Sequence, residues 1–297
     1  MSNTTRIGII GIGAMGLAMA RNLHARAYPL LVRDIAPPAL AEAASLGIEA
    51  CDTPAALAAR CDVLVLVVVD AAQIEDVLFG PGGVVHAAPA VRNHPLAVMV
   101  CSTIAAHDTE RFAERLKAQS IDFMDAPISG GPVRAADGSL SMMLACEPVL
   151  LARHDTLLRD LAAKLFFIGP KVGDAARTKL VNNLLAGVNL VAAAEAMALG
   201  AQLGLDRQVL FDVISASSGA SWIGQDRMTR ALAGDYAPRA RAVILTKDVT
   251  LAVQMADAAG VDTPLGDAAL SVFKATVAAG LGEQDDAAVV KAIWPGF

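Results

Sequence analysis

Aromatic and charged side chains are both scarce in this sequence. Phenylalanine, tryptophan and tyrosine make up 4% of the 297 residues and charged residues 18%, although 55% of the residues are hydrophobic. The apolar fraction is therefore mostly alanine, valine and leucine, of which alanine favours helices and valine favours strands. This composition predicts a mixed α/β protein, and the length is that of two domains at roughly 100–200 residues per domain.

The sequence also has no excess of positive charge. Its formal net charge is −6, and we find no block of like charges that would indicate a charged tail. A dispersed acidic balance argues against a nucleic-acid backbone as the main partner.

Cysteine is sparse as well. None of the four cysteines pairs with another at a spacing typical of a metal site or a redox motif, and a chain this long needs no disulfide scaffold. They are Cys51, Cys61, Cys101 and Cys146. We expect reduced thiols in a cytoplasmic protein, and no bound metal.

No targeting segment is visible, because a predicted strand begins within the first few residues. One window, residues 180–203, is long and apolar enough to compare with a membrane span. It contains five polar residues, which a spanning segment rarely tolerates: Asn182, Asn183, Asn189, Glu195 and Gln202. We therefore expect a buried helix of a soluble protein rather than a membrane anchor.

The first half of the chain alternates short apolar runs with helical stretches. The pattern predicts strands at 6–10, 30–33, 62–69, 97–103, 123–128, 140–146 and 164–168. Helices are expected at 14–26, 37–46, 71–79 and 107–119, with one more between the last two strands. Strands and helices that alternate in this way build a parallel sheet with helices on both faces, the doubly wound Rossmann type of α/β fold.

The second half gives only helical signals. Helices are predicted at 174–203, 207–217, 223–233, 243–259 and 265–279. The first of these would be about 45 Å long at 1.5 Å per residue, and it would join the two halves. We expect a Rossmann-like domain at 1–170 and an all-α domain at 171–297 that serves the substrate cleft and oligomerisation.

A glycine-rich turn follows the first predicted strand and opens the first predicted helix. It fits the pattern G-x-G-x-x-G as Gly11-Ile12-Gly13-Ala14-Met15-Gly16. In this context the first glycine permits the tight turn, the second lets the backbone approach a pyrophosphate, and the third allows close packing of helix on strand. The free N–H groups of the helix N-terminus favour the phosphates. The sequence therefore predicts a dinucleotide-binding site.

An acidic residue stands where such a site needs one. Asp34 lies 18 residues after Gly16, at the end of the second predicted strand, where a carboxylate accepts hydrogen bonds from the ribose hydroxyls. A carboxylate there repels a 2′-phosphate, so the sequence favours NAD over NADP. The neighbouring Arg33 leaves NADP open, because an arginine can accommodate that phosphate.

Three further motifs follow the glycine turn along the chain. They are Asp125-Ala126-Pro127-Ile128-Ser129-Gly130-Gly131, then Lys179-Leu180-Val181-Asn182-Asn183, then Lys247-Asp248 with Leu251-Ala252. With the glycine turn, these four motifs cover nearly the whole chain and resemble, in the same order, those of the β-hydroxyacid dehydrogenases, the family that includes 3-hydroxyisobutyrate dehydrogenase.

The resemblance assigns roles to these residues. It implies that Lys179 is the general acid/base and that Asn183, four positions along the same helix face, binds the substrate hydroxyl or orients the lysine. A lysine can take the hydroxyl proton if desolvation lowers its pKa. Ser129, with the backbone of Gly130 and Gly131, would hold the substrate carboxylate. We expect this helix at the domain junction, where clefts form.

The same resemblance adds cofactor contacts. It implies that Thr103 contacts the cofactor, that the pair Val68 and Val69 lies beside the adenosine, and that Lys247 lies near the closed cofactor–substrate site. The valines are equally explained as sheet core. The sequence departs from its relatives in the stretch before the catalytic lysine. Relatives often have a second glycine there, whereas Gly173 of this chain is followed by Asp174. We expect a changed helix entry there.

Within the family, several stretches look most like the L-threonate dehydrogenase branch, which acts on four-carbon sugar acids. They are 184–188, 195–199, 221–222 and 234–239. Trp222 then becomes a candidate for the substrate pocket, or equally an aromatic of the core or of a dimer interface.

Two alternatives remain at this stage. One is an NADP-dependent semialdehyde reductase, for tartronate or succinic semialdehyde, or an imine reductase of the same architecture. The other is a catalytically silent NAD-binding sensor module. The presence of Lys179, Asn183 and Ser129 argues against this alternative. The resemblance also implies a homodimer or homotetramer packed through the alanine-rich helices, and a small hydroxy acid as the substrate.

Overall fold

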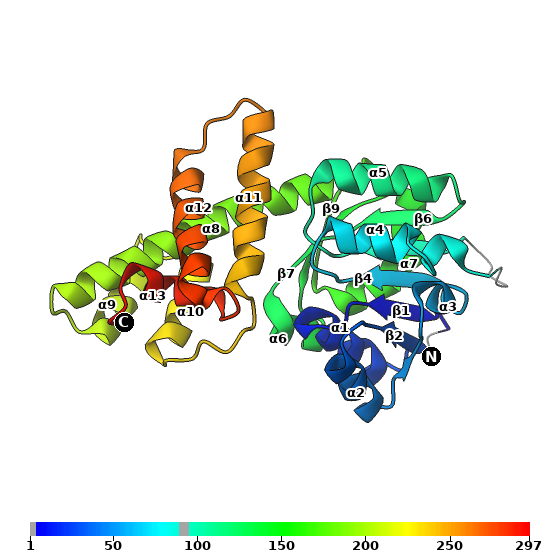
Figure 1. Cartoon of the computed structure of the whole chain (residues 1–297), viewed down its shortest axis with the longest axis horizontal. Helices are drawn as coiled ribbons and strands as arrows, with labels where there is room; N and C mark the ends of the chain where they lie inside the picture. The colour runs from blue at the N-terminus through cyan, green and yellow to red at the C-terminus, as the bar shows by residue number, and fades with distance from the viewer. Residues whose placement is uncertain (1–3, 89–94) are drawn as a thin grey trace. The chain divides into compact units, whose positions relative to one another are not determined.

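The computed structural model describes residues 4–88 and 95–297. The chain packs as two units, Met1–Lys179 and Leu180–Phe297. The boundary falls within one long helix, so each unit has its own core while a single helix belongs to both (Figure 1).

The first unit is built around one sheet. Its strands follow the order β3-β2-β1-β4-β5-β6-β8-β7, with β9 paired to β8. The strands are β1 (Ile7–Ile10), β2 (Leu30–Arg33), β3 (Glu49–Ala50), β4 (Val63–Leu66), β5 (Ala97–Val100), β6 (Asp122–Asp125), β7 (Ile128–Ser129), β8 (Ser141–Ala145) and β9 (Lys164–Gly169). The helices are α1 (Ala14–Ala25), α2 (Pro37–Ser45), α3 (Pro54–Ala58), α4 (Ala71–Phe79), η1 (Val84–His86), α5 (Ala106–Lys117), α6 (Gly131–Asp137) and α7 (Pro148–Leu161).

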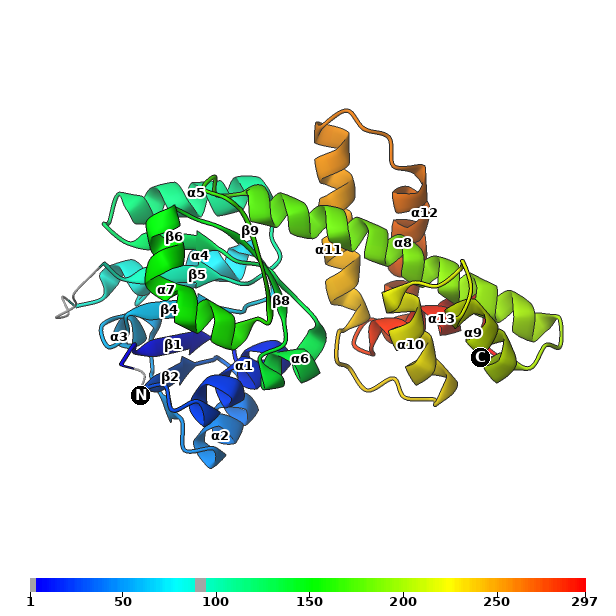
Figure 2. The ribbon, with the colours of Figure 1, turned by 180° about the vertical axis from the view of Figure 1, so that it is seen from behind.

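Helices cover both faces of this sheet, because its central strands are apolar at every position. Side chains alternate between the two faces of a strand, so Ile9 of β1 joins one core and Leu64 of β4 joins the other. The first core lies under α1 and α7, and α7 is seen in front of the sheet in Figure 2. The second core lies under α3, α4 and α5. The expected doubly wound α/β fold is confirmed.

The sheet is not wholly parallel, which the strand pattern did not predict. Strand β8 runs antiparallel to β6 and β7 and parallel to β9. The strand expected at 123–128 is two strands, β6 and β7, separated by Ala126 and Pro127. Proline has no N–H to donate to a ladder, so it interrupts a strand in the interior of a sheet.

The second unit is helical, as expected. It contains most of α8 (Asp174–Gln202), then α9 (Arg207–Ser215), α10 (Trp222–Leu232), α11 (Ala242–Ala258), α12 (Pro264–Thr276), the π-helical turn η2 (Val277–Leu281), the short η3 (Asp286–Ala288) and α13 (Val289–Ile293). Its core gathers around Leu190, Val249 and Phe273, which come from α8, α11 and α12.

Helix α8 is less buried than the sequence led us to expect. It is the one helix in the described ranges that is long and apolar enough to pass a test for a membrane span, and 39% of its most apolar window is buried. Leu190 and Ala194 are in the core, whereas Leu185 and Leu199 are about three-fifths exposed. The helix therefore presents a core face and an open apolar face.

Candidate active site

The glycine turn joins β1 to α1 as predicted. Gly11 has a φ of 87°, a left-handed conformation that favours glycine. A Cβ on Gly11 would lie 2.6 Å from the carbonyl oxygen of Val67, and one on Gly16 would lie 1.9 Å from that of Gly11. A side chain at Gly11 would push the turn away from the segment after β4, and one at Gly16 would push α1 away from the turn, so both glycines are required by the packing of the protein itself.

Gly13 is different, because a Cβ at this position would have nothing within 4 Å. The protein's own packing gives no reason for glycine here, whereas a ligand approaching the backbone does. Gly13 is also the residue before α1, which begins Ala14-Met15, and it has no side chain to cap the free N–H groups of the helix. The turn thus fits the pyrophosphate of a dinucleotide.

Asp34 lies immediately after β2 and contacts this turn. Its Oδ2 atom accepts a hydrogen bond of 2.7 Å from the N–H of Ile12, and its Oδ1 atom accepts one of 2.8 Å from the N–H of Ala36. These bonds hold the carboxylate at the edge of the glycine turn. The Nε atom of Arg33 is buried and has no hydrogen-bond partner in the described residues.

The other predicted cofactor residues follow neighbouring strands. Val68 and Val69 come just after β4, which ends at Leu66 rather than at residue 69, and Thr103 comes after β5. The carboxyl ends of the parallel strands β1, β4 and β5 meet at one edge of the sheet, where ligands of open α/β folds bind. The N–H of Val69 donates to Oε1 of Gln73, which ties the segment after β4 to α4.

The predicted carboxylate-binding loop joins β7 to α6. Ser129 is the last residue of β7, and the next two glycines have φ values of 136° and 75°. A Cβ on Gly131 would have nothing within 4 Å, whereas one on Gly130 would press on Arg134. The backbone at Gly131 is therefore open to a ligand. Helix α6, which starts there, was not predicted.

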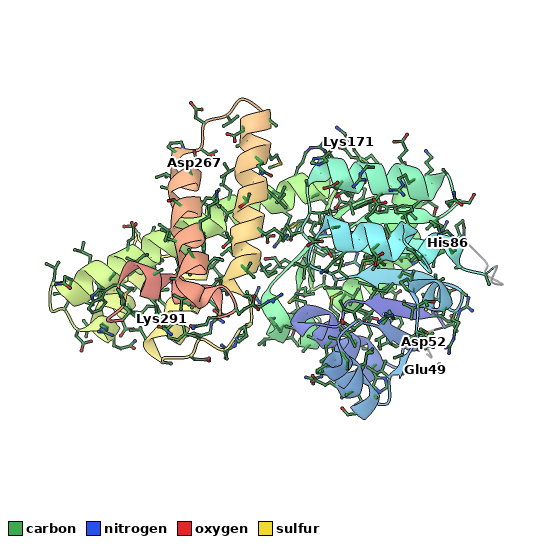
Figure 3. All side chains as sticks on the ribbon, viewed as in Figure 1. Glu49, Asp52, His86, Lys171, Asp267 and Lys291 are labelled. Atoms are coloured by element: carbon green, nitrogen blue, oxygen red, sulfur yellow. The ribbon has the colours of Figure 1, made fainter. Side chains whose placement is uncertain are left out.

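The signature that contains this loop begins with a buried carboxylate. Asp125 ends β6 and is 2% exposed. Its Oδ2 atom accepts hydrogen bonds from the N–H groups of Gly173, at 2.9 Å, and Ala176, at 3.1 Å. Burial raises the pKa of Asp125 to about 6, and the backbone hydrogen bonds oppose that rise. Lys171, labelled in Figure 3, lies on the turn that enters α8.

The two predicted catalytic residues are both buried on α8. Lys179 is 6% exposed and Asn183 is 7% exposed. Lysine is almost never this buried unless it is paired, so Lys179 is not a solvated surface charge. The spacing of four residues places both side chains on one face of the helix.

Asn183 belongs to a hydrogen-bonded chain in the helical unit. Its Nδ2 atom donates to Oδ2 of Asp248 at 2.8 Å, and Nζ of Lys247 lies 2.7 Å from Oδ1 of the same carboxylate. Asp248 is 5% exposed. One buried carboxylate therefore holds two of the predicted site residues, the asparagine of α8 and the lysine of α11.

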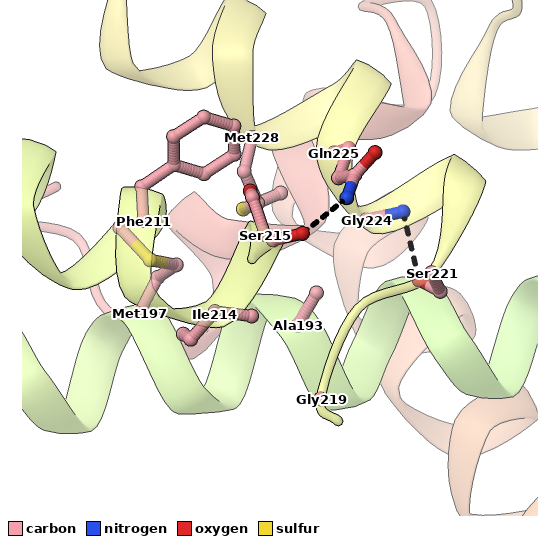
Figure 4. Close-up of a pocket in the computed structure, with 10 residues that line it drawn as sticks. All are labelled: Ala193, Met197, Phe211, Ile214, Ser215, Gly219, Ser221, Gly224, Gln225 and Met228. Carbon is pink, nitrogen blue, oxygen red and sulfur yellow. Dashed lines mark hydrogen bonds between the residues drawn. The ribbon is translucent and has the colours of Figure 1, made fainter. Parts of the chain in front are cut away.

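Trp222 is the first residue of α10 and is 52% exposed, which excludes it from the core of its own unit. Beside it, a small pocket opens between α8, α9 and α10 (Figure 4). Its lining includes Met197, Phe211 and Gln225, and the side chain of Gln225 donates to the carbonyl oxygen of Ser215. None of the predicted site residues lines this pocket.

Sequence reasoning did not identify Asp125 and Asp248 as site residues, although both lie inside motifs that it singled out. The sequence did offer one signal for both residues, a carboxylate among apolar neighbours. Such a carboxylate is expected to be buried, and a buried charge needs hydrogen-bond partners. In the part of the chain that the structure describes, no cluster of His, Cys, Asp or Glu could hold a metal ion.

Comparisons with known proteins agree with this geometry. Residues 6–169 match the NAD-binding domain of 6-phosphogluconate dehydrogenase, and residues 173–293 match the NAD-binding model of NADP-dependent 3-hydroxyisobutyrate dehydrogenase. The chain is 39% identical to an L-threonate dehydrogenase of Cupriavidus necator over 98% of this chain and 96% of that protein. It is 37% identical to the L-threonate dehydrogenase of Escherichia coli K12, over 96% and 93%.

A solved structure has the same fold over almost the whole chain. The crystal structure of 3-hydroxyisobutyrate dehydrogenase from Salmonella typhimurium aligns with a TM-score of 0.88 at 36% identity, over 97% of this chain and 99% of that one. The chain therefore belongs to the β-hydroxyacid dehydrogenase family, whose members are nicotinamide-dependent oxidoreductases.

Proposed function

We propose that this protein oxidises a small 3-hydroxy acid with NAD, and that the acid is a four-carbon sugar acid such as L-threonate. The observation that carries the proposal is the burial of Lys179 and Asn183 on one face of α8, with Asp248 hydrogen-bonded to the asparagine. The relatives named L-threonate dehydrogenase, at 34–39% identity, support the substrate class.

The reaction needs one proton acceptor and one hydride acceptor. When bound, the nicotinamide supplies the second, because it takes the hydride from the carbon that carries the hydroxyl group. Lys179 in its neutral form takes the hydroxyl proton, so that the C–H and O–H bonds break and a C=O bond forms. Asn183 holds the hydroxyl oxygen or the lysine in place. Ser129, with the backbone at Gly130 and Gly131, binds the carboxylate.

The cofactor side of the proposal is NAD rather than NADP. The carboxylate of Asp34 is held at the glycine turn by Ile12 and Ala36, where it accepts bonds from ribose hydroxyls and repels a 2′-phosphate. Val68, Val69 and Thr103 would bound the cofactor along the same sheet edge, and the family resemblance assigns Lys247 to the closed cofactor–substrate site. Arg33 is the residue whose charge would favour NADP.

The two parts of the chain would divide the work. Residues 1–170 take the dinucleotide, and residues 171–297 provide Lys179, Asn183 and Trp222 for the substrate together with the surfaces for self-association. Exposed apolar side chains on the helical unit, among them Leu199, Leu203 and Val209, support a homodimer or homotetramer. We propose that the protein works in the cytoplasm.

The proposal is tested by measuring NADH and NADPH formation on a panel of hydroxy acids: L-threonate, D-glycerate, 3-hydroxyisobutyrate and 3-hydroxypropionate. We expect turnover with NAD and L-threonate, with a kcat/KM at least about tenfold above that with NADP. Turnover with 3-hydroxyisobutyrate but not with L-threonate would contradict the sugar-acid substrate. Silence on the whole panel with both cofactors would contradict the oxidation itself.

A further inference from the structure

Helix α8 has an unusual N-terminus. The first N–H groups of any helix lack partners within the helix, and the residue just before the helix commonly supplies a side chain to cap them. Here that residue is Gly173, whose carbonyl accepts the first helical bond from Arg177. A side chain at this position would be strained, because its φ is 94°, and a Cβ would have to displace the carboxylate of Glu110.

Asp125 supplies the missing cap from the end of β6. Two hydrogen bonds reach the same atom, Oδ2, from Gly173 and from Ala176. These are the N–H groups of the residue before the helix and of its third residue, the pair that a capping motif satisfies. The donors lie 48 and 51 residues away in the sequence, so the contact ties a sheet strand to a helix rather than closing a local turn.

We propose that Asp125 is a positioning residue for Lys179. The inference rests on the proposed function, in which Lys179 carries the proton. Lys179 lies three residues after Ala176, about 4.5 Å along the helix axis and on nearly the same face. Asp125 therefore fixes the helical turn from which Lys179 projects.

Asp125 also lies close in the sequence to the loop proposed to bind the substrate carboxylate. Ser129 follows it by four residues, through Ala126, Pro127 and Ile128. The segment that begins with the cap of α8 thus ends at the loop proposed to bind the substrate carboxylate. Because one short segment holds both, the lysine and the carboxylate site keep a constant spacing. A shift of about 1 Å in such a spacing can cost on the order of 100-fold in rate.

The test is a double-mutant cycle of Asp125→Ala and Lys179→Ala, with L-threonate and NAD. A residue that acts only through Lys179 loses its effect when the lysine is absent. We expect Asp125→Ala alone to lower kcat by about 100-fold with little change in the KM for L-threonate. In the Lys179→Ala background we expect it to lower the residual kcat by less than about threefold.

Two controls separate positioning from general loss of structure. In Asp125→Asn the amide oxygen can replace Oδ2 and accept both bonds, so we expect most of the lost kcat to return. Leu158→Ala removes a fully buried side chain of α7 that belongs neither to the cap of α8 nor to the loop proposed to bind the carboxylate. It should lower the melting temperature at least as much as Asp125→Ala does, with kcat per folded molecule unchanged.

Hydrogen exchange gives a readout that needs no turnover. We expect amides of residues 173–180 to exchange at least about tenfold faster in Asp125→Ala and close to the wild-type rate in Asp125→Asn, because a lost cap frays the first turn. Additive losses in the cycle, or unchanged exchange, would overturn the positioning role. A Lys179→Ala enzyme as active as wild type would instead overturn the proposed function, and with it the catalytic meaning of the contact.

Discussion

The dinucleotide turn and the hydroxy-acid machinery are built in opposite ways. The turn works through the absence of side chains, since Gly13 and Gly16 leave space for a phosphate and for the sheet. The machinery on α8 depends on two buried polar side chains, Lys179 and Asn183. The surrounding residues must provide hydrogen-bond partners for each of them. The first kind of site is local in the sequence, whereas the second is assembled by tertiary contacts.

This difference decides how each site responds to change. Adding atoms to the turn obstructs a ligand, while the polar network on α8 is harmed by removing atoms. We therefore expect substitutions at the turn to act on cofactor binding and those on α8 to act on turnover.

Lys179→Met should lower kcat by about 1,000-fold, because it removes the group that takes the hydroxyl proton. The dissociation constant for NAD, measured by calorimetry, should change less than about threefold, since the glycine turn is untouched. Lys171→Met is the matched control, because this exposed lysine precedes α8, and its kcat should equal that of wild type. A wild-type kcat in Lys179→Met would contradict the assignment of turnover to α8 and of cofactor binding to the glycine turn.

Gly13→Val should raise the dissociation constant for NAD by about 100-fold, which is about 2.7 kcal/mol. The added side chain meets nothing in the protein within 4 Å of its Cβ, so the melting temperature should stay near that of wild type. Gly16→Ala should instead lower the melting temperature, since its Cβ would lie 1.9 Å from the carbonyl of Gly11. Equal stability losses in both variants would contradict a ligand-driven role for Gly13.

Asp248→Ala should lower kcat by about 30-fold, because it leaves the buried amide of Asn183 without its acceptor, a cost of about 1–3 kcal/mol. Asp248→Asn keeps an oxygen for Asn183 but loses the charge beside Lys247, so it should recover part of the rate. Steady-state kinetics at saturating NAD measure both variants. A loss confined to the KM for NAD would place Asp248 on the cofactor side instead.

The smallest effect concerns the pH dependence of stability. The folded pKa of Asp125 is raised to about 6 from 3.8 by burial, so between these values the unfolded chain releases the proton first. The contribution of Asp125 to the free energy of unfolding therefore falls as pH rises from about 4 to 6, by at most about 3 kcal/mol, and is level above pH 6.

Denaturant unfolding of wild type and Asp125→Asn at pH 4, 5, 6 and 7 measures this slope. The difference between the two proteins should change across pH 4–6 in favour of the asparagine variant and remain constant above that range. A constant difference from pH 4 to pH 7 would show that the folded carboxyl titrates at an ordinary pKa.

Much of the fold was predictable because its signals are local. Apolar runs such as Val63–Leu66 mark strands that are buried on both faces, and the bounds of β2 and α4 agree with the prediction at both ends. Helix α6 was not predicted, because Gly130, Gly131 and Pro132 indicate a turn. The two-residue β3 has no pattern long enough to detect.

Some residues of the site could likewise be located from local patterns in the sequence, and others could not. The glycine turn and Asp34 could be located from spacing alone, since strand, turn and helix follow one another directly. The partners of Asp125 and Asn183 lie 48 and 65 residues away, and no local pattern encodes such a pairing. Resemblance to a family marked the motifs, but only the folded chain shows which carboxylate holds which residue.

Chemical rescue of Lys179→Ala tests the central claim most directly. Small primary amines such as methylamine and ethylamine are added to the variant, and NADH formation with L-threonate is recorded at saturating NAD. If Lys179 takes the hydroxyl proton, the rate should rise in proportion to the free amine, and more for amines of higher pKa. A variant that turns over at the wild-type rate, or that no amine restores, would contradict a proton-transfer role for Lys179.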